Sequence, residues 1–213
     1  MSGGVTSFTV PRHALLDHRM AELRDATTPP AAFRRLLAEI GAILTVAATA
    51  DLPATSRAVT TPLETIQHPV LAVAEPALVA ILRAGLGLLE GAQRIMPAAP
   101  IGHIGMARNE HTLQPMEYML RLPPDAAERG VILLDPMLAT GGSAAAACTR
   151  LKQAGITSIR LLVVVAAPEG VATMAAAHPD VPVWAAALDR GLNAQGFIMP
   201  GLGDAGDRCF GTE

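Results

Sequence analysis

Short apolar runs alternate with amphipathic segments along most of the chain. Five runs have the length and composition of buried strands, namely residues 77–82, 100–106, 131–134, 159–166 and 181–188. Apolar residues recur at helical spacing over residues 13–25, 30–50, 86–95, 143–154 and 170–177. Strands that alternate with helices are typical of βαβ units. The pattern therefore predicts an α/β fold with a mostly parallel sheet flanked by helices.

The length of the chain fits one domain that spans residues 1–213. Within it we expect a pair of amino-terminal helices between residues 12 and 50. The second carries an apolar stripe from Phe33 to Leu44, which indicates packing in the core or against another subunit. No internal repeat and no low-complexity tract interrupts this plan.

Hydrophobic residues make up 51% of the chain and the mean hydropathy is +0.37, which raises the question of a membrane protein. The longest stretch without Asp, Glu, Lys or Arg has only 14 residues, 136–149, and begins with a proline. A spanning helix needs about 20 apolar residues. Residues 1–11 lack the basic start and apolar core of a secretory signal. We therefore expect a cytoplasmic protein without a membrane partner.

The charged residues and the cysteines exclude further classes of protein. A net charge of −3 without any cluster of Lys or Arg argues against nucleic acid as the main partner. Cys148 and Cys209 lie far apart in sequence, so they imply no disulfide framework. The six histidines show no metal-ligand spacing, and Cys148 is expected in the core. A small-molecule substrate is the remaining expectation.

The segment from Val131 to Lys152 carries the clearest chemical motif. An apolar run ends in Asp135, a glycine-bearing loop holds Thr140 and Ser143, and a helix is expected to begin there. The first N–H groups of a helix lack internal partners and face the positive end of its dipole, so they bind phosphate. Glycines in such a loop allow an anion to approach the backbone. A phosphate next to a carboxylate that can accept from hydroxyls indicates a sugar phosphate.

Two arginines follow other predicted strands. Arg83 and Arg108 would reach the same carboxyl edge of the sheet, and guanidinium groups bind phosphate oxygens in a bidentate manner. Together with the helix N-terminus they indicate a ligand with more than one phosphate. The known nucleotide-binding motifs do not account for these phosphate-binding features. A P-loop requires a Lys that is absent from the segment 140–143, and too few residues follow the G-x-G-x-x-G match at 201–206 for a dinucleotide-binding unit.

Two further segments fall outside the alternation. Residues 108–128 form a long polar connection with three prolines, which is either an active-site lid or an ordinary surface excursion. Residues 189–211 hold six glycines, which suggests either a disordered terminus or a segment that presents main-chain groups to a flat nucleobase. Phe197, Ile198 and Leu202 favour the second interpretation, because a disordered tail needs no such residues.

These motifs together resemble the uracil phosphoribosyltransferases over nearly the whole chain. The stretch 135–143 is similar to the family's phosphoribosyl-diphosphate loop, 82–87 to its pyrophosphate loop, and 201–207 to its uracil-binding hood. Residues 108–110 resemble the start of its flexible arm. Pro136 replaces the second acid that many phosphoribosyltransferases carry, a change typical of the uracil branch. Phe197 stands where the family commonly has Tyr.

The resemblance implies a pentosyltransferase of pyrimidine salvage that converts uracil and phosphoribosyl diphosphate (PRPP) to UMP and diphosphate. It implies Mg²⁺ held mainly by the substrate diphosphate and waters, an assembly as a homodimer or larger homo-oligomer, and possible activation by GTP. By this resemblance the catalytic residues are Asp135, Arg83, Arg108 and Asp204. The same four residues bind PRPP, together with Pro136, Met137, Leu138, Ala139, Thr140, Gly141, Gly142 and Ser143. The uracil-binding residues are Ile198, Gly203, Asp204 and Ala205 of the hood, which spans residues 189–213.

Two alternatives use the same motifs. A non-catalytic regulator of pyrimidine metabolism could bind PRPP or UMP in the same pocket, although the chain lacks the basic face of an RNA-binding protein. A phosphoribosyltransferase for another base is the second alternative, against which the hood and Pro136 argue. An assay with several bases separates these cases.

Overall fold

One sheet of eight strands organises the fold, and the computed structural model describes residues 7–108 and 115–212. The strand order is β1-β10-β9-β7-β4-β5-β6, and β8 extends β7 along β9. Every neighbouring pair is parallel except β5 and β6, which confirms the predicted sheet. The strands are β1 (Phe8–Thr9), β4 (Ala77–Leu82), β5 (Ile101–Arg108), β6 (Pro115–Arg121), β7 (Val131–Leu134), β8 (Met137–Leu138), β9 (Ile159–Ala166) and β10 (Val183–Leu188).

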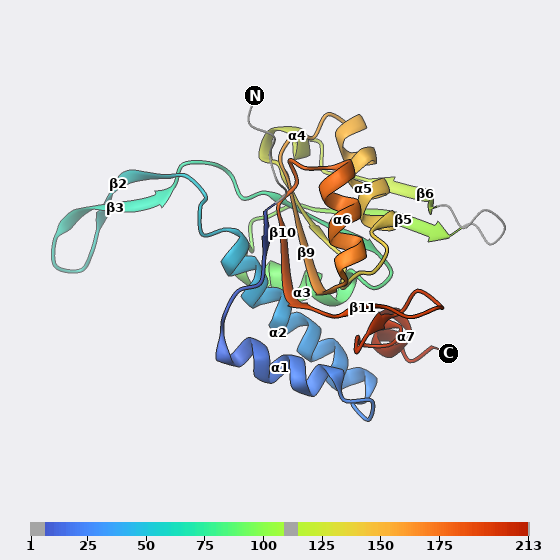
Figure 1. Cartoon of the computed structure of the whole chain (residues 1–213). Coiled ribbons are helices and arrows are strands. Elements are labelled where there is room, and N and C mark those ends of the chain that lie inside the picture. The colour runs from blue at the N-terminus through green and yellow to red at the C-terminus, as the bar shows by residue number, and fades with distance from the viewer. Residues whose placement is uncertain (1–6, 109–114, 213) are drawn as a thin grey trace.

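Helices cover both faces of this sheet (Figure 1). Alternate residues of β4 enter different hydrophobic clusters: Leu78 and Ala80 pack with the first group of helices, and Val79 and Ile81 with the second. Burial on both faces explains why the strands are almost uniformly apolar. The first group comprises α1 (Ala14–Arg24), α2 (Pro30–Ala48) and α3 (Leu86–Ile95); the second comprises α4 (Ala126–Arg129), α5 (Gly142–Gln153) and α6 (Pro168–Ala177).

The apolar stripe of α2 lies in the core of this chain, with Phe33 and Leu44 fully buried at its two ends. Helix α3 packs directly across α2. A Cβ on Gly91 would lie 1.8 Å from the carbonyl oxygen of Ala38, so glycine is required for this close approach. In the part of the chain that the structure describes, none of the helices has both the length and the apolar character needed to cross a bilayer.

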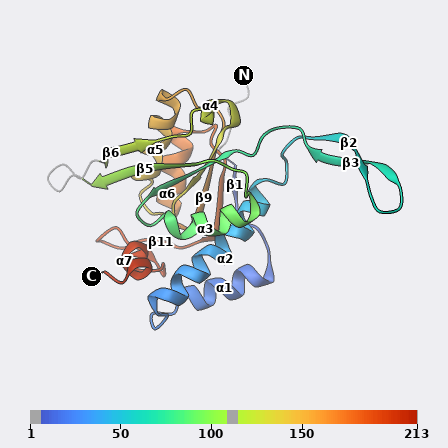
Figure 2. The ribbon, with the colours of Figure 1, turned by 180° about the vertical axis from the view of Figure 1, so that it is seen from behind.

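A β-hairpin projects from the body of the molecule (Figures 1 and 2). It consists of β2 (Ala54–Thr60) and β3 (Thr65–Leu71), which pair only with each other. Most of its side chains are exposed, and Leu63 at the turn is 95% exposed. We did not predict these strands, because alternation of apolar and polar residues marks a strand with one buried face and this hairpin has none.

The long polar connection contains regular structure that we did not predict. Residues 115–121 of this connection form β6, which pairs antiparallel with β5 at the edge of the sheet, and α4 follows. Pro115 occupies the first position of β6, where an edge strand tolerates proline. Residues 109–114 lie outside the described residues, so the interpretation of this segment as a lid stays a prediction.

The glycine-rich carboxyl-terminal segment is folded onto the first group of helices. It contains β11 (Gly191–Leu192), β12 (Ile198–Met199) and the short helix α7 (Ala205–Phe210). The side chains of Ile198, Leu202 and Cys209 are buried in the same cluster as those of α2. The interpretation as a disordered terminus is therefore wrong for residues up to 212, and the apolar residues of the segment serve as its anchors.

Candidate active site

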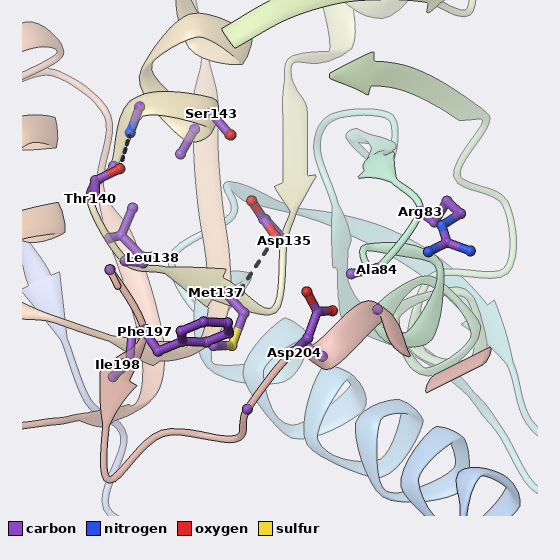
Figure 3. A pocket seen from close by; sticks show the side chains of 18 residues that line it. Arg83, Ala84, Asp135, Met137, Leu138, Thr140, Ser143, Phe197, Ile198 and Asp204 are labelled. Atoms are coloured by element: carbon purple, nitrogen blue, oxygen red, sulfur yellow. Dashed lines mark hydrogen bonds between the residues drawn. The ribbon is translucent and has the colours of Figure 1, made fainter. Parts of the chain in front are cut away.

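A cavity of about 400 Å³ opens at the carboxyl ends of the parallel strands (Figure 3). Parallel α/β sheets bind their ligands at this edge. Three stretches that are distant in sequence meet here: the loop after β4, the segment from β7 to α5, and the carboxyl-terminal hood. Its lining consists of Arg83, Ala84, Asp135 and residues 137–144, 196–198 and 203–206.

The loop before α5 forms one end of the cavity. The first intrahelical bond of α5 runs from Ala145 N to Gly141 O, 2.9 Å. The N–H groups of residues 142–144 precede this bond, and helical geometry leaves them without an acceptor four residues earlier. The side-chain oxygen of Thr140 lies 3.4 Å from the N–H of Gly142. These donors, with the helix dipole behind them, are the groups on which the predicted anion cradle depends, and anion binding here stays a prediction.

The two glycines of this loop have different roles. Gly141 has φ +82°, and a Cβ there would lie 2.8 Å from the Cβ of Thr173 on α6. Gly141 is thus required for the turn and for packing against α6, and the expectation that its missing Cβ gives an anion access is wrong. At Gly142 an added Cβ would meet only the Thr140 hydroxyl, at 3.7 Å. The backbone of this loop is therefore open at Gly142 and not at Gly141.

Asp135 is the buried carboxyl group of the cavity. It directly follows β7, is 9% exposed, and receives one weak hydrogen bond from the N–H of Met137, 3.4 Å from Oδ1. Burial raises the pKa of Asp135 to about 7, which the Met137 N–H opposes only in part. A ligand that donates hydroxyl hydrogens here would stabilise the charged carboxylate.

Arg83 lies at the rim of the cavity, at the end of β4, and its side chain is 57% exposed. Its Nη2 lies 3.6 Å from Oδ1 of Asp207, and its guanidinium carbon is 5.5 Å from the ring centre of Phe210. Both partners belong to α7, so Arg83 is turned toward the hood. The sequence could not predict these contacts, because they join segments more than 120 residues apart by a flexible side chain.

Asp204 faces Arg83 and Asp135 from the hood side of the cavity (Figure 3). It is the N-cap of α7, where its Oδ1 accepts from the N–H of Asp207 at 3.0 Å. Aspartate is a preferred N-cap residue because its side chain satisfies a free N–H of the first turn. The cap holds the carboxylate of Asp204 at the hood side of the cavity.

The hood supplies the other end of the cavity. Ile198, Gly203 and Ala205, for which uracil binding stays a prediction, all line it, and Phe197 adds a ring that is 45% exposed. Four small residues also line the cavity although they were not among the individually predicted binding residues, namely Ala84, Ala144, Gly196 and Gly206. Each is adjacent in sequence to a predicted residue or to Phe197, and its small side chain gave no separate signal.

Two predicted residues stand apart from this arrangement. Pro136 is absent from the lining and buried, and its carbonyl oxygen accepts from the N–H groups of Val164 and Val165 at 3.0 and 3.1 Å. It thus pairs with β9. Arg108 ends β5, but its side chain lies outside the described residues, so its role stays a prediction.

The comparisons with known proteins agree on one family. The family model described as uracil phosphoribosyltransferase matches residues 10–212. A protein of Lacticaseibacillus paracasei with that name is 52% identical over 207 residues, which cover 97% of this chain and 99% of the relative. A protein of Rhizobium etli with the same name is 49% identical over 96% of this chain and 98% of its own length.

Solved structures support the same fold. The AQ2163 protein from Aquifex aeolicus is 35% identical and superimposes with a TM-score of 0.88 over 95% of this chain and 97% of its own. A hypoxanthine-guanine phosphoribosyltransferase from Bacillus anthracis, at 11% identity, has a TM-score of 0.52 over 75% of this chain and 80% of its own. At this low identity the second likeness concerns the fold alone, which is that of the type I phosphoribosyltransferases.

Proposed function

The chain belongs to the uracil phosphoribosyltransferase family, and on this premise we propose that its cavity transfers the 5-phosphoribosyl group of PRPP to N1 of uracil. The products are UMP and diphosphate, and the enzyme is a pentosyltransferase. The observation that carries the proposal is the union, in one cavity, of an anion cradle, a buried carboxyl group and a glycine-rich hood. The reported relatives give no support to the alternative of a non-catalytic regulator.

The 5-phosphate of PRPP would bind in the cradle at the start of α5. The N–H groups of residues 142–144 and the hydroxyls of Thr140 and Ser143 can donate to its oxygens, and Gly142 leaves room for it. Phosphate bound here would place the ribose beside Asp135. The ribose 2- and 3-hydroxyls would then donate to the Asp135 carboxylate and lower its pKa from about 7.

The diphosphate would lie at the Arg83 side of the cavity. The pair between Arg83 and Asp207 is largely exposed, and such pairs contribute only about 0–1 kcal/mol. A diphosphate with several negative charges can therefore displace Asp207 from Arg83. Arg108 is proposed to approach the same group from the end of β5. Both cations would neutralise the charge that develops on the departing diphosphate.

The donor groups at the cavity fit Mg²⁺. Asp135 and Asp204 present carboxylate oxygens, the ligands that a hard divalent cation prefers. Among the described residues there is no cluster of three or more His, Cys, Asp or Glu side chains, so most ligands would be substrate oxygens and waters. When bound in this way, the cation would add positive charge at the diphosphate.

Bond cleavage and formation at C1 complete the reaction. The C1–O bond to diphosphate breaks and leaves its electron pair on the diphosphate, while C1 gains oxocarbenium character. The lone pair of uracil N1 then forms the C1–N1 bond, and the N1 proton passes to solvent or diphosphate. The protein forms no covalent bond, so the rate enhancement comes from positioning and charge stabilisation.

Uracil is proposed to be read by main-chain groups of Ile198, Gly203 and Ala205. Its edge presents acceptor, donor and acceptor in a row, whereas cytosine lacks the proton on N3. A carbonyl placed to receive that proton would stay unpaired with cytosine, at a cost of about 1–3 kcal/mol. Phe197 has no hydroxyl, so the contact that Tyr provides in many members is replaced here by an apolar ring.

One experiment tests the proposed reaction. Purified protein is incubated with Mg²⁺, PRPP and each of uracil, cytosine, hypoxanthine and adenine, and the nucleotide products are separated by chromatography. We expect UMP from uracil and no more than trace product from the other bases. If another base gives the main nucleotide product, the proposed base is wrong. If none of the four bases gives a nucleotide, the proposal that the protein is a catalyst is refuted.

The remaining proposals concern assembly and location. We propose a homodimer or larger homo-oligomer, because an isolated two-stranded hairpin with exposed Leu63, Ile66 and Leu71 is marginally stable until it is covered. Light scattering after gel filtration tests this. We propose a cytoplasmic location, since Cys148 and Cys209 are both unpaired and buried. Activation by GTP stays a prediction of the family resemblance, to be tested by adding GTP to the assay.

A further inference from the structure

An ion pair joins the last residue of α1 to the first residue of the hood, outside the lining of the cavity. Asp189 directly follows β10 and is 8% exposed. Its Oδ1 accepts from Arg24 Nη2 at 2.6 Å, and its Oδ2 accepts from Arg24 Nη1 at 2.9 Å. Arg24 is the last residue of α1, 165 positions earlier in the chain. The two side chains thus form a bidentate pair between the amino-terminal helices and the start of the hood.

The pair holds both main-chain groups of one hood residue. The N–H of Gly201 donates to Asp189 Oδ2 at 2.8 Å, and the carbonyl oxygen of Gly201 accepts from Arg24 Nη1 at 3.0 Å. Gly201 has φ +65°, and a Cβ there would lie 2.0 Å from the carbonyl oxygen of Ile198. The turn is therefore tight, and the Arg24 guanidinium and the Asp189 carboxylate hold its main-chain groups in place.

Gly201 lies between the residues that face the base. Ile198 precedes it by three positions and Gly203 follows by two, and both line the cavity. Other arginines hold the neighbouring hood residues: Arg208 Nη1 donates to Leu202 O at 2.9 Å, and Arg34 Nη1 donates to Cys209 O at 2.7 Å. Those contacts act on residues downstream of the turn. The Arg24–Asp189 pair acts on the turn itself.

We propose that Arg24 and Asp189 are positioning residues for the base: they fix the spacing of the hood groups that read the pyrimidine edge, and so determine affinity and selectivity for the base. The inference rests on the proposed function. Neither residue lines the cavity, so neither is a catalytic residue. The cradle, Asp135 and Arg83 belong to other segments, and Asp204 is held by its own bond from the N–H of Asp207, so PRPP affinity should depend on the pair much less than affinity for the base does.

The physical reason is the cost of breaking a buried charge pair. Without Arg24, the carboxylate of Asp189 would remain buried with the N–H of Gly201 but without its cation, and the chain would move to hydrate it. A displacement of about 1 Å in a binding site can lower turnover roughly 100-fold. Here such a displacement would act mainly on the hood residues that face the base, Ile198 and Gly203. We expect KM for uracil to rise roughly 10- to 100-fold.

The test compares Arg24→Ala, Arg24→Lys and Asp189→Asn with the wild type. Arg19→Ala is the matched control, because Arg19 lies on the same helix, is 28% exposed against 25% for Arg24, and pairs with two carboxylates away from the hood, Glu22 and Glu39. For each protein, KM for uracil, KM for PRPP, kcat and the uracil-to-cytosine ratio of kcat/KM are measured. The melting temperature is recorded in parallel.

We expect Arg24→Ala and Asp189→Asn to raise KM for uracil and lower the uracil-to-cytosine ratio, with KM for PRPP changed less than about twofold. Arg24→Lys should recover part of the loss, since Lys keeps the charge without the bidentate geometry. Arg19→Ala should match the wild type. If Asp189→Asn fails to fold, the two Arg24 variants carry the same comparison.

Two outcomes would overturn the inference. If the Arg24 variants keep the wild-type KM for uracil and the wild-type selectivity, or raise both KM values equally, the pair only stabilises the fold. A lower melting temperature and a lower kcat, caused by a smaller fraction of folded protein, with unchanged KM values would also show that the pair only stabilises the fold. A wild-type protein that forms no UMP refutes the proposed function and the inference together, whereas an active wild type with unaffected variants refutes the inference alone.

Discussion

Replacement of Asp135 by Asn tests separately how the charge of this side chain affects the stability of the fold and how it affects catalysis. Asn has nearly the same size and keeps an oxygen that can accept from the N–H of Met137, but it carries no charge at any pH. The carboxyl group of Asp135 is buried with little hydrogen bonding, so its charged form is unfavourable in the folded protein. The variant should therefore be more stable than the wild type at alkaline pH and far less active.

The magnitude follows from the two pKa values. The ordinary pKa of an aspartate, taken for the unfolded chain, is 3.8, and burial raises the pKa of Asp135 to about 7 in the folded protein. Between these values the folded protein retains a proton that the unfolded chain releases, so the free energy of unfolding falls as the pH rises. The loss is absent below pH 3.8 and complete above about pH 7. It amounts to at most about 4 kcal/mol, because water in the open cavity can solvate the carboxylate.

Denaturant unfolding at pH 5, 6, 7 and 8 measures this difference. The stability of Asp135→Asn relative to the wild type should increase by up to about 3 kcal/mol between pH 5 and pH 8. Asp180→Asn is the control, because the hydrogen bond from Lys152 lowers the pKa of Asp180, so this carboxylate is charged in both the folded and the unfolded state from pH 5 to 8. The stability difference between this variant and the wild type should therefore not change across this pH range. Turnover of Asp135→Asn with uracil and PRPP should fall on the order of 100-fold.

A flat difference in stability between the two proteins across this pH range would refute the argument, since it would mean that Asp135 ionises in the folded state as it does in the unfolded chain. Wild-type turnover in Asp135→Asn would remove the carboxylate from the mechanism. The two measurements are independent, so either step of the reasoning can fail alone.

Three other substitutions test separate parts of the cavity. Gly142→Val should leave the melting temperature nearly unchanged but weaken PRPP binding in calorimetry. Gly141→Ala should instead lower the free energy of unfolding in urea by about 1 kcal/mol or more, because residue 141 has φ +82° and lies against α6. Equal effects of the two substitutions would contradict separate roles for the two glycines. Asp204→Asn keeps an N-cap acceptor, so the stability should be maintained, but it loses the negative charge, so turnover should fall, most at low Mg²⁺. Unchanged turnover would show that the charge of Asp204 has no part in the reaction. Burial raises the pKa of Cys148 to about 12, so its thiol should resist iodoacetamide at pH 8 until the protein is unfolded, and rapid native labelling would contradict the burial.

The parts of the fold that the sequence predicted are those in which one local pattern has one physical cause. The buried strands are uniformly apolar because both faces are covered, and the Thr140–Ser143 motif marks a helix N-terminus with hydroxyl donors. Local patterns also located the hood, since Ile198 and Leu202 would be costly in a disordered tail. Each of these features depends on residues within a short stretch of chain.

The features that escaped prediction depend on distant segments or on side-chain conformation. The projecting hairpin has no buried face and so no periodic signal. The orientation of Arg83 is set by Asp207, and the turn at Gly201 is set by Arg24 and Asp189, which only the folded chain brings together. The function of Gly141 was misassigned for the same reason, because its neighbour Thr173 belongs to another helix.

The division of the cavity between segments has a consequence for evolution and engineering. The cradle and Asp135 come from one continuous stretch on the sheet, whereas Arg24 of α1 and Arg34 of α2 donate to hood carbonyl oxygens, and Arg208 of the hood donates to the carbonyl oxygen of Asp25. A change of hood sequence can therefore alter the accepted heterocycle while the half that holds the sugar phosphate is inherited intact. Grafting a hood into a homologous scaffold should succeed only when the arginines beneath it are transferred as well.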